Sequence, residues 1–255
     1  MIRPLNSSEL MSLFFGNQTI HLLSTDSTNN FAAKLLAKGL ATEGAVIMAD
    51  HQTGGRGQRG NVWLSESGKN LLSSFVCKPD NLSVERQVVL TWLTSLSVVE
   101  TLRKFNIEAR IKWPNDIFVG SKKICGILIE NQLNGKCIQH AIIGIGLNVA
   151  QLEFGDFAAT SVSKETGMNY APIEILHFLR REMEKQFGQL DQISDEQIKN
   201  NYMDSLYLLN ELAPFEDESG SFYGTITHVT NTGMLVVQKE KEKVMYGIKE
   251  IRYCS

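Results

Sequence analysis

The segment from His51 to Gly60 has the residue types that anion chemistry uses. It contains four glycines and two arginines, Arg56 and Arg59, and it follows the short apolar run 45–49. Such a run predicts a buried strand that ends in a loop. Glycine lets backbone N–H groups approach an anion closely, and a guanidinium group matches a carboxylate or phosphate with two hydrogen bonds. Taken alone, however, the segment is better explained as a mobile basic surface loop.

A second group of candidate residues is the run KWPND at 112–116, followed by Lys123. Pro114 ends the preceding strand, because proline cannot donate a backbone hydrogen bond. The Gly-Ser dipeptide that comes next predicts a hairpin, which brings Asp116 and Lys123 together. These two residues are either a surface salt bridge, worth on the order of 0–1 kcal/mol, or part of a site. Gly126 and the apolar residues directly after it favour a site.

Strands and helices must position these residues. Hydrophobic periodicity predicts an amphipathic helix over 84–105 that packs against a sheet. Asn134-Gly135 predicts a second hairpin, whose returning strand ends in the sequence GIGLN at 144–148. Glycines at this spacing leave room for a flat apolar ligand against the backbone. The other predicted elements are strands at 20–23, 71–76 and 107–113, a helix that begins near the cap residues Ser27 and Thr28 and ends before Gly39, and helices at 172–187 and 194–209.

The pattern changes beyond Asn210 to short alternating strands separated by turn residues. Such a pattern predicts a small barrel-like β module. Its charged stretches, 216–218 and 239–243, are explained as a solvated hairpin tip.

Composition narrows the class of protein. A chain of 255 residues with a net charge of −3 can hold one large domain and a small one, and it has no global attraction to nucleic acid or anionic lipid. The four cysteines and five histidines lack metal-ligand spacing, which favours reduced thiols in a cytoplasmic protein. No run has the length or apolarity of a membrane span or secretion signal.

Four motifs, at 51–60, 112–116, 123–130 and 144–148, resemble in order and separation the catalytic domain of biotin protein ligases. The resemblance implies an α+β fold. A mixed, largely antiparallel sheet flanked by helices, as in class II aminoacyl-tRNA synthetases, would occupy 1–209, and a small SH3-like β-barrel would occupy 210–255. About twenty residues precede the first predicted strand, too few for the helix-turn-helix domain with which some relatives repress transcription, so we expect no DNA binding.

The resemblance also implies site residues. The catalytic residues would be Lys123, Arg56, Asp116 and Lys112, with no metal bound directly by the protein. ATP or the adenylate would contact Arg56, Gly57, Gln58, Arg59, Trp63, Asn115 and Asn148, although a tryptophan at position 63 could equally be core or a lid. Biotin would contact Ser27, Thr28, Asn29, Gln52, Gly55, Arg56, Lys123, Gly126, Gly144 and Gly146.

The implied reaction has two steps. ATP activates the biotin carboxylate as biotinyl-5′-adenylate and releases pyrophosphate, which requires cationic side chains and Mg²⁺ on the phosphates. A lysine of a biotin carboxyl carrier protein or domain of a biotin-dependent carboxylase then attacks, and Asp116 assists in removing its proton. No covalent enzyme intermediate is needed. Relatives often pair their sheets edge to edge, so a homodimer is compatible with this class.

Gln58 departs from the Gly-Arg-Gly-Arg pattern of many relatives. In the resembled enzymes an arginine at this position helps to hold the adenylate. We therefore expect weaker retention of the adenylate here, unless Arg59 replaces that contact.

Two other functions stay open at this point. A lipoate–protein ligase shares the fold and the Lys-x-x-Gly element that begins at Lys123, but the Gly-Arg-Gly loop and the KWPND run favour the biotin branch. A noncatalytic biotin- or nucleotide-binding module would bind ligand and release no pyrophosphate. The presence of both Lys123 and Asp116 argues against such a module.

Overall fold

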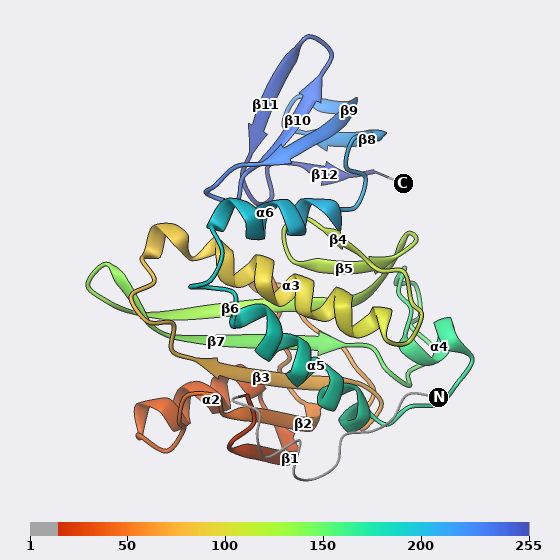
Figure 1. Cartoon of the computed structure of the whole chain (residues 1–255). Coiled ribbons are helices and arrows are strands. Elements are labelled where there is room, and N and C mark those ends of the chain that lie inside the picture. Colours follow the sequence, from red (N-terminus) through yellow and green to blue (C-terminus); the bar gives the residue numbers. More distant parts are fainter. Residues whose placement is uncertain (1–14, 255) are drawn as a thin grey trace.

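The computed structural model describes residues 15–254, and of Arg59 only the backbone (Figure 1). Within this range the larger sheet has the strand order β1-β2-β3-β7-β6-β5-β4. β1 and β2 run parallel, and all other neighbours in this sheet run antiparallel, as predicted. The strands are β1 (Thr19–Thr25), β2 (Val46–Gln52), β3 (Leu71–Cys77), β4 (Arg110–Lys112), β5 (Asp116–Val119), β6 (Lys122–Asn134) and β7 (Cys137–Leu147).

Alternation along the central strands divides the larger sheet into two faces. Side chains two residues apart point to the same face of a strand. Ile127, Ile143 and Ile145 belong to the main core, on the face covered by α3 (Val88–Arg103) and α5 (Pro172–Phe187). Ile142 and its neighbours pack instead with α2 (Thr28–Ala37) on the opposite face. Gly126, Gly144 and Gly146 alternate with the core residues and therefore lie on the α2 face.

Helix α3 differs from the predicted amphipathic helix. It begins at Val88, after a 3₁₀ turn at Val84–Arg86, and it is buried around nearly its whole circumference. The reason is tertiary, because α5 and α6 (Asp195–Asp204) cover the side that faces away from the sheet. Three of its buried hydroxyl groups, those of Thr94, Ser97 and Thr101, donate to carbonyls one turn earlier in the helix. Thr94 donates to the carbonyl of Leu90 at 2.7 Å, which is the local bond that threonine makes in a helix interior.

Two predicted elements are shorter than expected. The strand over 107–113 reduces to β4, and the helix over 194–209 ends at Asp204. The chain leaves the helix because it pairs with β4. Ile111 N–H donates to the carbonyl of Ser205 at 2.8 Å, and Tyr207 N–H donates back to the carbonyl of Ile111 at 2.9 Å.

The smaller sheet follows α6 and has the order β11-β10-β9-β8-β12 (Figure 1). Its neighbouring strands are antiparallel, and one apolar core runs from it into the larger sheet, through Ile226 and Val237 to Ile111. The domain boundary at 209/210 stays a prediction. The remaining elements are α4 (Val162–Thr166), β8 (Leu212–Asp217), β9 (Gly220–Val229), β10 (Leu235–Lys239), β11 (Glu242–Tyr246) and β12 (Arg252–Tyr253).

All four cysteines are free thiols. Burial raises the pKa of Cys77 to about 12 and that of Cys125 still further, so both stay protonated and unreactive at neutral pH. Among residues 15–254, no helix has the length and apolarity needed to cross a bilayer.

Candidate active site

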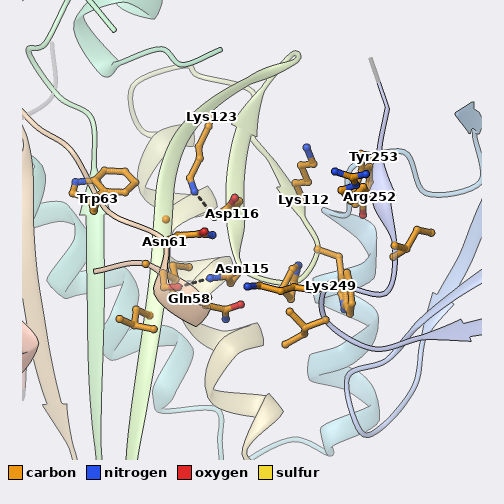
Figure 2. A pocket seen from close by; sticks show the side chains of 18 of the residues that line it. Gln58, Asn61, Trp63, Lys112, Asn115, Asp116, Lys123, Lys249, Arg252 and Tyr253 are labelled. Atoms are coloured by element: carbon orange, nitrogen blue, oxygen red, sulfur yellow. Dashed lines mark hydrogen bonds and ion pairs between the residues drawn. The ribbon is translucent and has the colours of Figure 1, made fainter. Parts of the chain in front are cut away.

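A cavity of about 1420 Å³ lies between the glycine-bearing face of the larger sheet, the Gly-rich loop and the smaller sheet. Figure 2 shows Trp63, Lys123, Asp116 and Lys112 around it, from the loop, β6, β5 and β4 respectively. Most of the residues that the sequence predicted for a site line this one space. They are Ser27, Thr28, Asn29, Gln52, Arg56, Gly57, Gln58, Trp63, Lys112, Asn115, Asp116, Lys123, Gly126, Gly144 and Gly146.

The N-terminus of α2 carries a buried hydroxyl and amide network. Ser27 is the N-cap, but its side chain makes no capping bond. Instead the Thr28 N–H donates to Oε1 of Gln52 at 2.7 Å, and the Thr28 hydroxyl donates to the same oxygen at 3.1 Å. On the next strand, Ser74 Oγ lies 2.6 Å from Oδ1 of Asn29. The network therefore fixes several donors and acceptors at a helix N-terminus, where a small polar head group can bind.

Three positions on the floor of the cavity have room only for glycine, because other side chains lie too close to their Cα atoms. A Cβ atom at Gly144 would lie 2.5 Å from Oδ1 of Asn29, and one at Gly146 would lie 2.6 Å from Cε2 of Trp63. A Cβ at Gly126 would also meet the Trp63 ring, at 3.0 Å. The backbone of β6 and β7 thus lets Asn29 and Trp63 lie directly on the sheet.

Glu130 had no predicted role, and it binds two residues that line the cavity, Arg56 and Asn29. Nη2 of Arg56 donates to both its carboxylate oxygens, at 2.9 and 2.7 Å, and Nδ2 of Asn29 donates to Oε2 at 2.7 Å. A signal existed in the sequence. Glu130 lies four residues after Gly126 on one strand, so the two-residue period puts both on the cavity face.

Lys123 and Asp116 form the ion pair that the predicted hairpin implied. Nζ of Lys123 lies 2.7 Å from Oδ1 of Asp116, and both side chains are partly exposed to the cavity. The backbone of Lys123 is fixed from the other side. Its N–H donates to the carbonyl of Ala158 at 2.9 Å, and its own carbonyl accepts from the Thr160 N–H at 2.9 Å.

Lys112 is held between two aromatic rings. Its Nζ lies 4.4 Å from the centroid of Phe118 and 4.8 Å from that of Tyr253. Burial lowers the pKa of Lys112, and the Asp116 carboxylate partly opposes this effect. The side chain is thus a partly desolvated cation beside the Lys123–Asp116 pair.

The smaller sheet supplies a wall of the cavity that the sequence analysis missed. No local signal could have found these residues, because they meet the KWPND run only through the packing of the two sheets. The wall residues are Glu216, Asp217, Glu218, Ser219, Lys239, Glu242, Val244, Met245, Tyr246, Ile248, Lys249, Glu250, Ile251, Arg252 and Tyr253.

Two predicted site residues, Asn148 and Gly55, stand apart from the lining. Asn148 is buried, and its Nδ2 donates to the carbonyl of Thr160 at 3.0 Å. Gly55 belongs to the Gly-rich loop itself, and a Cβ there would lie 2.5 Å from the Trp63 carbonyl oxygen. The Arg59 side chain lies outside the described residues. The roles predicted for all three stay predictions.

Cationic side chains in the lining give the cavity a capacity to bind anions. Among the described residues, no cluster of three or more His, Cys, Asp or Glu side chains has the geometry of a metal site. Arg56, Lys112 and Lys123 instead present three cationic groups to one cavity. Such a set can stabilise a carboxylate and a phosphate brought together.

Comparison with known proteins identifies the class. The family model described as the biotin/lipoate A/B protein ligase family matches residues 22–148. The bifunctional ligase/repressor BirA of Bacillus spizizenii is 30% identical over 91% of this chain and 72% of its own length. The biotin–[acetyl-CoA-carboxylase] ligase of Paracoccus denitrificans is 30% identical over 85% of this chain and 92% of its own.

A solved structure has the same overall fold. The biotin protein ligase of Aquifex aeolicus in complex with biotin and ATP superposes with a TM-score of 0.77 at 27% identity, covering 92% of this chain and 99% of that one. The predicted α+β fold class is thereby confirmed. The chain belongs to the biotin/lipoate A/B protein ligase family and, within it, to the ligase enzymes known as biotin protein ligases.

Proposed function

We propose that this enzyme activates biotin with ATP as biotinyl-5′-adenylate and then transfers the biotinyl group to a lysine of a biotin carboxyl carrier protein or domain. The observation that carries the proposal is that one cavity joins a buried hydroxyl and amide network to three cationic side chains. A network of that kind can hydrogen-bond an uncharged polar ring, and the cations can bind a carboxylate that lies next to a triphosphate. The relatives named for biotin ligation support the same assignment.

In the first step, Ser27, Thr28, Asn29 and Gln52 hold the ureido ring of biotin at the N-terminus of α2. The apolar tail of biotin lies on the glycine-bearing backbone of β6 and β7, and its carboxylate reaches Lys123. A carboxylate oxygen then attacks the α-phosphorus of ATP. The new O–P bond forms as the bond to the pyrophosphate oxygen breaks, and Lys112, Lys123 and Arg56 stabilise the charge that develops.

Magnesium enters this scheme with the nucleotide. We propose that Mg²⁺ is held by the phosphates of ATP as part of the substrate, since no group of three or more His, Cys, Asp or Glu side chains among the described residues is arranged to hold a metal ion. Bound there, it would neutralise phosphate charge and assist the departure of pyrophosphate.

In the second step, the lysine amine of the acceptor attacks the carbonyl carbon of the mixed anhydride. The C–N bond forms, the bond from that carbon to the AMP oxygen breaks, and AMP leaves. The amine must lose a proton, and Asp116 is the carboxylate that we assign to accept it. Lys123, whose Nζ lies 2.7 Å from Oδ1 of Asp116, would turn to the substrate and free that carboxylate.

The test is biotin-dependent ATP–pyrophosphate exchange with magnesium present. Lys123→Ala should lower the exchange rate by about 10²–10³-fold, the usual cost of removing one charge-stabilising group. Lys122→Ala is the matched control, because Lys122 is the adjacent lysine and is exposed. Its rate should equal that of the unmodified enzyme.

Two results would overturn the proposal. Exchange that depends on lipoate and ignores biotin would assign the enzyme to the lipoate branch, and transfer to a lipoyl domain would then replace transfer to a biotin acceptor. Absence of exchange with either acid, from protein whose circular dichroism shows it folded, would favour a binding module without catalysis.

A further inference from the structure

Six aromatic side chains form a continuous ladder between the two sheets. The ladder begins on β5 of the larger sheet and ends on β11 of the smaller one. Successive ring centroids are 5.2 to 6.3 Å apart, which is the range of favourable aromatic pairs. In order along the ladder the rings are Phe118, Tyr207, Tyr253, Phe215, Phe222 and Tyr246.

Lys112 contacts two rings of this ladder, one from each sheet. Its Nζ is 4.4 Å from the centroid of Phe118 and 4.8 Å from that of Tyr253, both within the distance of a cation–π interaction. The hairpin of β4 and β5 sets the first contact. Lys112 pairs with Asp116, so Phe118 is the diagonal neighbour on the same face. The second contact comes from the far end of the chain, where Tyr253 pairs with Phe215.

Two charged side chains near Lys112 are each bound to another residue. Asp116 lies opposite on β5, but its carboxylate is bound by Lys123 at 2.7 Å. Arg252, which Figure 2 places beside Tyr253, is itself bound to Glu216 at 2.6 Å. The ammonium group of Lys112 has lost part of its hydration, and the two ring faces replace it with an interaction that favours the charged form.

We propose that Tyr253 is a positioning residue of the adenylation reaction, because with Phe118 it forms a cage that holds the Lys112 ammonium in the wall of the cavity toward the reacting carboxylate and phosphate. The smaller sheet then completes the catalytic centre and does more than cover it. The role of Lys112 in adenylation rests on the proposed function. The existence of the cage does not depend on that function.

The first experiment measures the cage without any activity. In protein labelled with ¹³Cε-lysine, the Lys112 resonance, assigned by its loss in Lys112→Arg, should be shifted upfield by the ring currents of the two aromatic residues. The shift should persist in Tyr253→Phe and shrink in Tyr253→Leu. A Lys112 signal at the position of an exposed lysine in the unmodified protein, or one unaltered in Tyr253→Leu, would overturn the cage whether or not the enzyme ligates biotin.

The second experiment asks whether the cage acts through Lys112. In biotin-dependent pyrophosphate exchange, Tyr253→Leu should lower kcat by about tenfold, whereas Tyr253→Phe should stay within about twofold. In a Lys112→Ala background, Tyr253→Leu should have no further effect. Phe222→Leu is the matched control, because Phe222 belongs to the same ladder but contacts Lys239. It should leave exchange unchanged.

Three outcomes of that experiment count against the positioning role. Equal losses in Tyr253→Phe and Tyr253→Leu would show that the ring is not what matters. Equal losses in Tyr253→Leu and Phe222→Leu would assign the effect to packing of the smaller sheet. Additive losses with Lys112→Ala would show that the two residues act independently. Absence of exchange in the unmodified enzyme would count against the proposed function, and the resonance shift would still decide whether the cage exists.

Discussion

Glu130 links Arg56 of the Gly-rich loop to Asn29 at the N-terminus of α2 through one carboxylate group. Both oxygens accept from Nη2 of Arg56, at 2.9 and 2.7 Å, and one also accepts from Nδ2 of Asn29 at 2.7 Å. This carboxylate binds the guanidinium group that our proposal assigns to the substrate. Under that proposal, substrate binding would exchange one anion for another at Arg56, and the loop position would depend on that exchange.

Glu130→Gln should release the loop. A glutamine side chain has one accepting oxygen where Glu130 has two, and the charge that holds the Arg56 guanidinium is gone. We expect trypsin to cut after Arg56 several times faster in the free enzyme and the KM for biotin to rise, because Asn29 also loses one of its hydrogen-bond partners. Glu100→Gln is the control, since Glu100 pairs with Arg103 on α3 at 2.6 Å, away from the loop. Equal cleavage rates in both variants would contradict the prediction.

The two glycines of β7 should have separable effects. In Gly144→Ala the new methyl group meets Asn29, whereas in Gly146→Ala it meets Trp63. We expect Gly144→Ala to raise the KM for biotin by about tenfold with little change in the KM for ATP, and Gly146→Ala to do the reverse. Steady-state exchange kinetics at varied biotin and varied ATP measure both. A rise in the same KM for both variants would contradict the assignment of Asn29 to biotin and Trp63 to the nucleotide.

Asn148→Ala should destabilise the fold. The Asn148 amide donates to the carbonyl of Thr160, and both residues are buried. The backbone N–H of Thr160 in turn donates to the carbonyl of Lys123. Loss of the Asn148 bond should lower the free energy of unfolding by about 1–3 kcal/mol, measured by urea denaturation. Asn200→Ala, at an exposed position of α6, should change it by less than about 0.5 kcal/mol. Unchanged stability with a raised KM for ATP would instead favour the adenine contact predicted from the sequence.

Asp217 should make stability depend on acid pH. The hydroxyl of Ser219, then that of Tyr246, then the ammonium of Lys239 hold the pKa of this carboxyl well below its ordinary value, against the opposing effect of burial. Because the folded pKa is below the unfolded value of about 3.9, the stabilisation is present above that pH and is lost as the pH falls toward the folded pKa. The Tm difference between the unmodified protein and Asp217→Asn should be largest near pH 7 and shrink below about pH 4. Asp156→Asn, at an exposed position, provides the baseline, and a difference that grows on acidification would refute the assignment.

The sequence by itself determined the features that follow from short-range order. Two turn signals fixed the hairpins, and the first of them brought Lys123 within 2.7 Å of Asp116. The glycine spacing in β7 fixed which residues face the cavity, because side chains in a strand alternate with a period of two. These outcomes depend on backbone geometry between neighbouring residues, so the local pattern was sufficient for them.

Only the tertiary structure decided what covers each face. Alternation puts Glu130 on the cavity face but does not say that Arg56, 74 residues earlier, will be its partner. The spacing in α3 suggested one apolar side, yet α5 and α6 bury the others. Tyr253 reaches Lys112 from the opposite end of the chain because two sheets pack along a shared apolar core. Such contacts are selected by the free energy of packing the whole chain, which no local window of sequence contains.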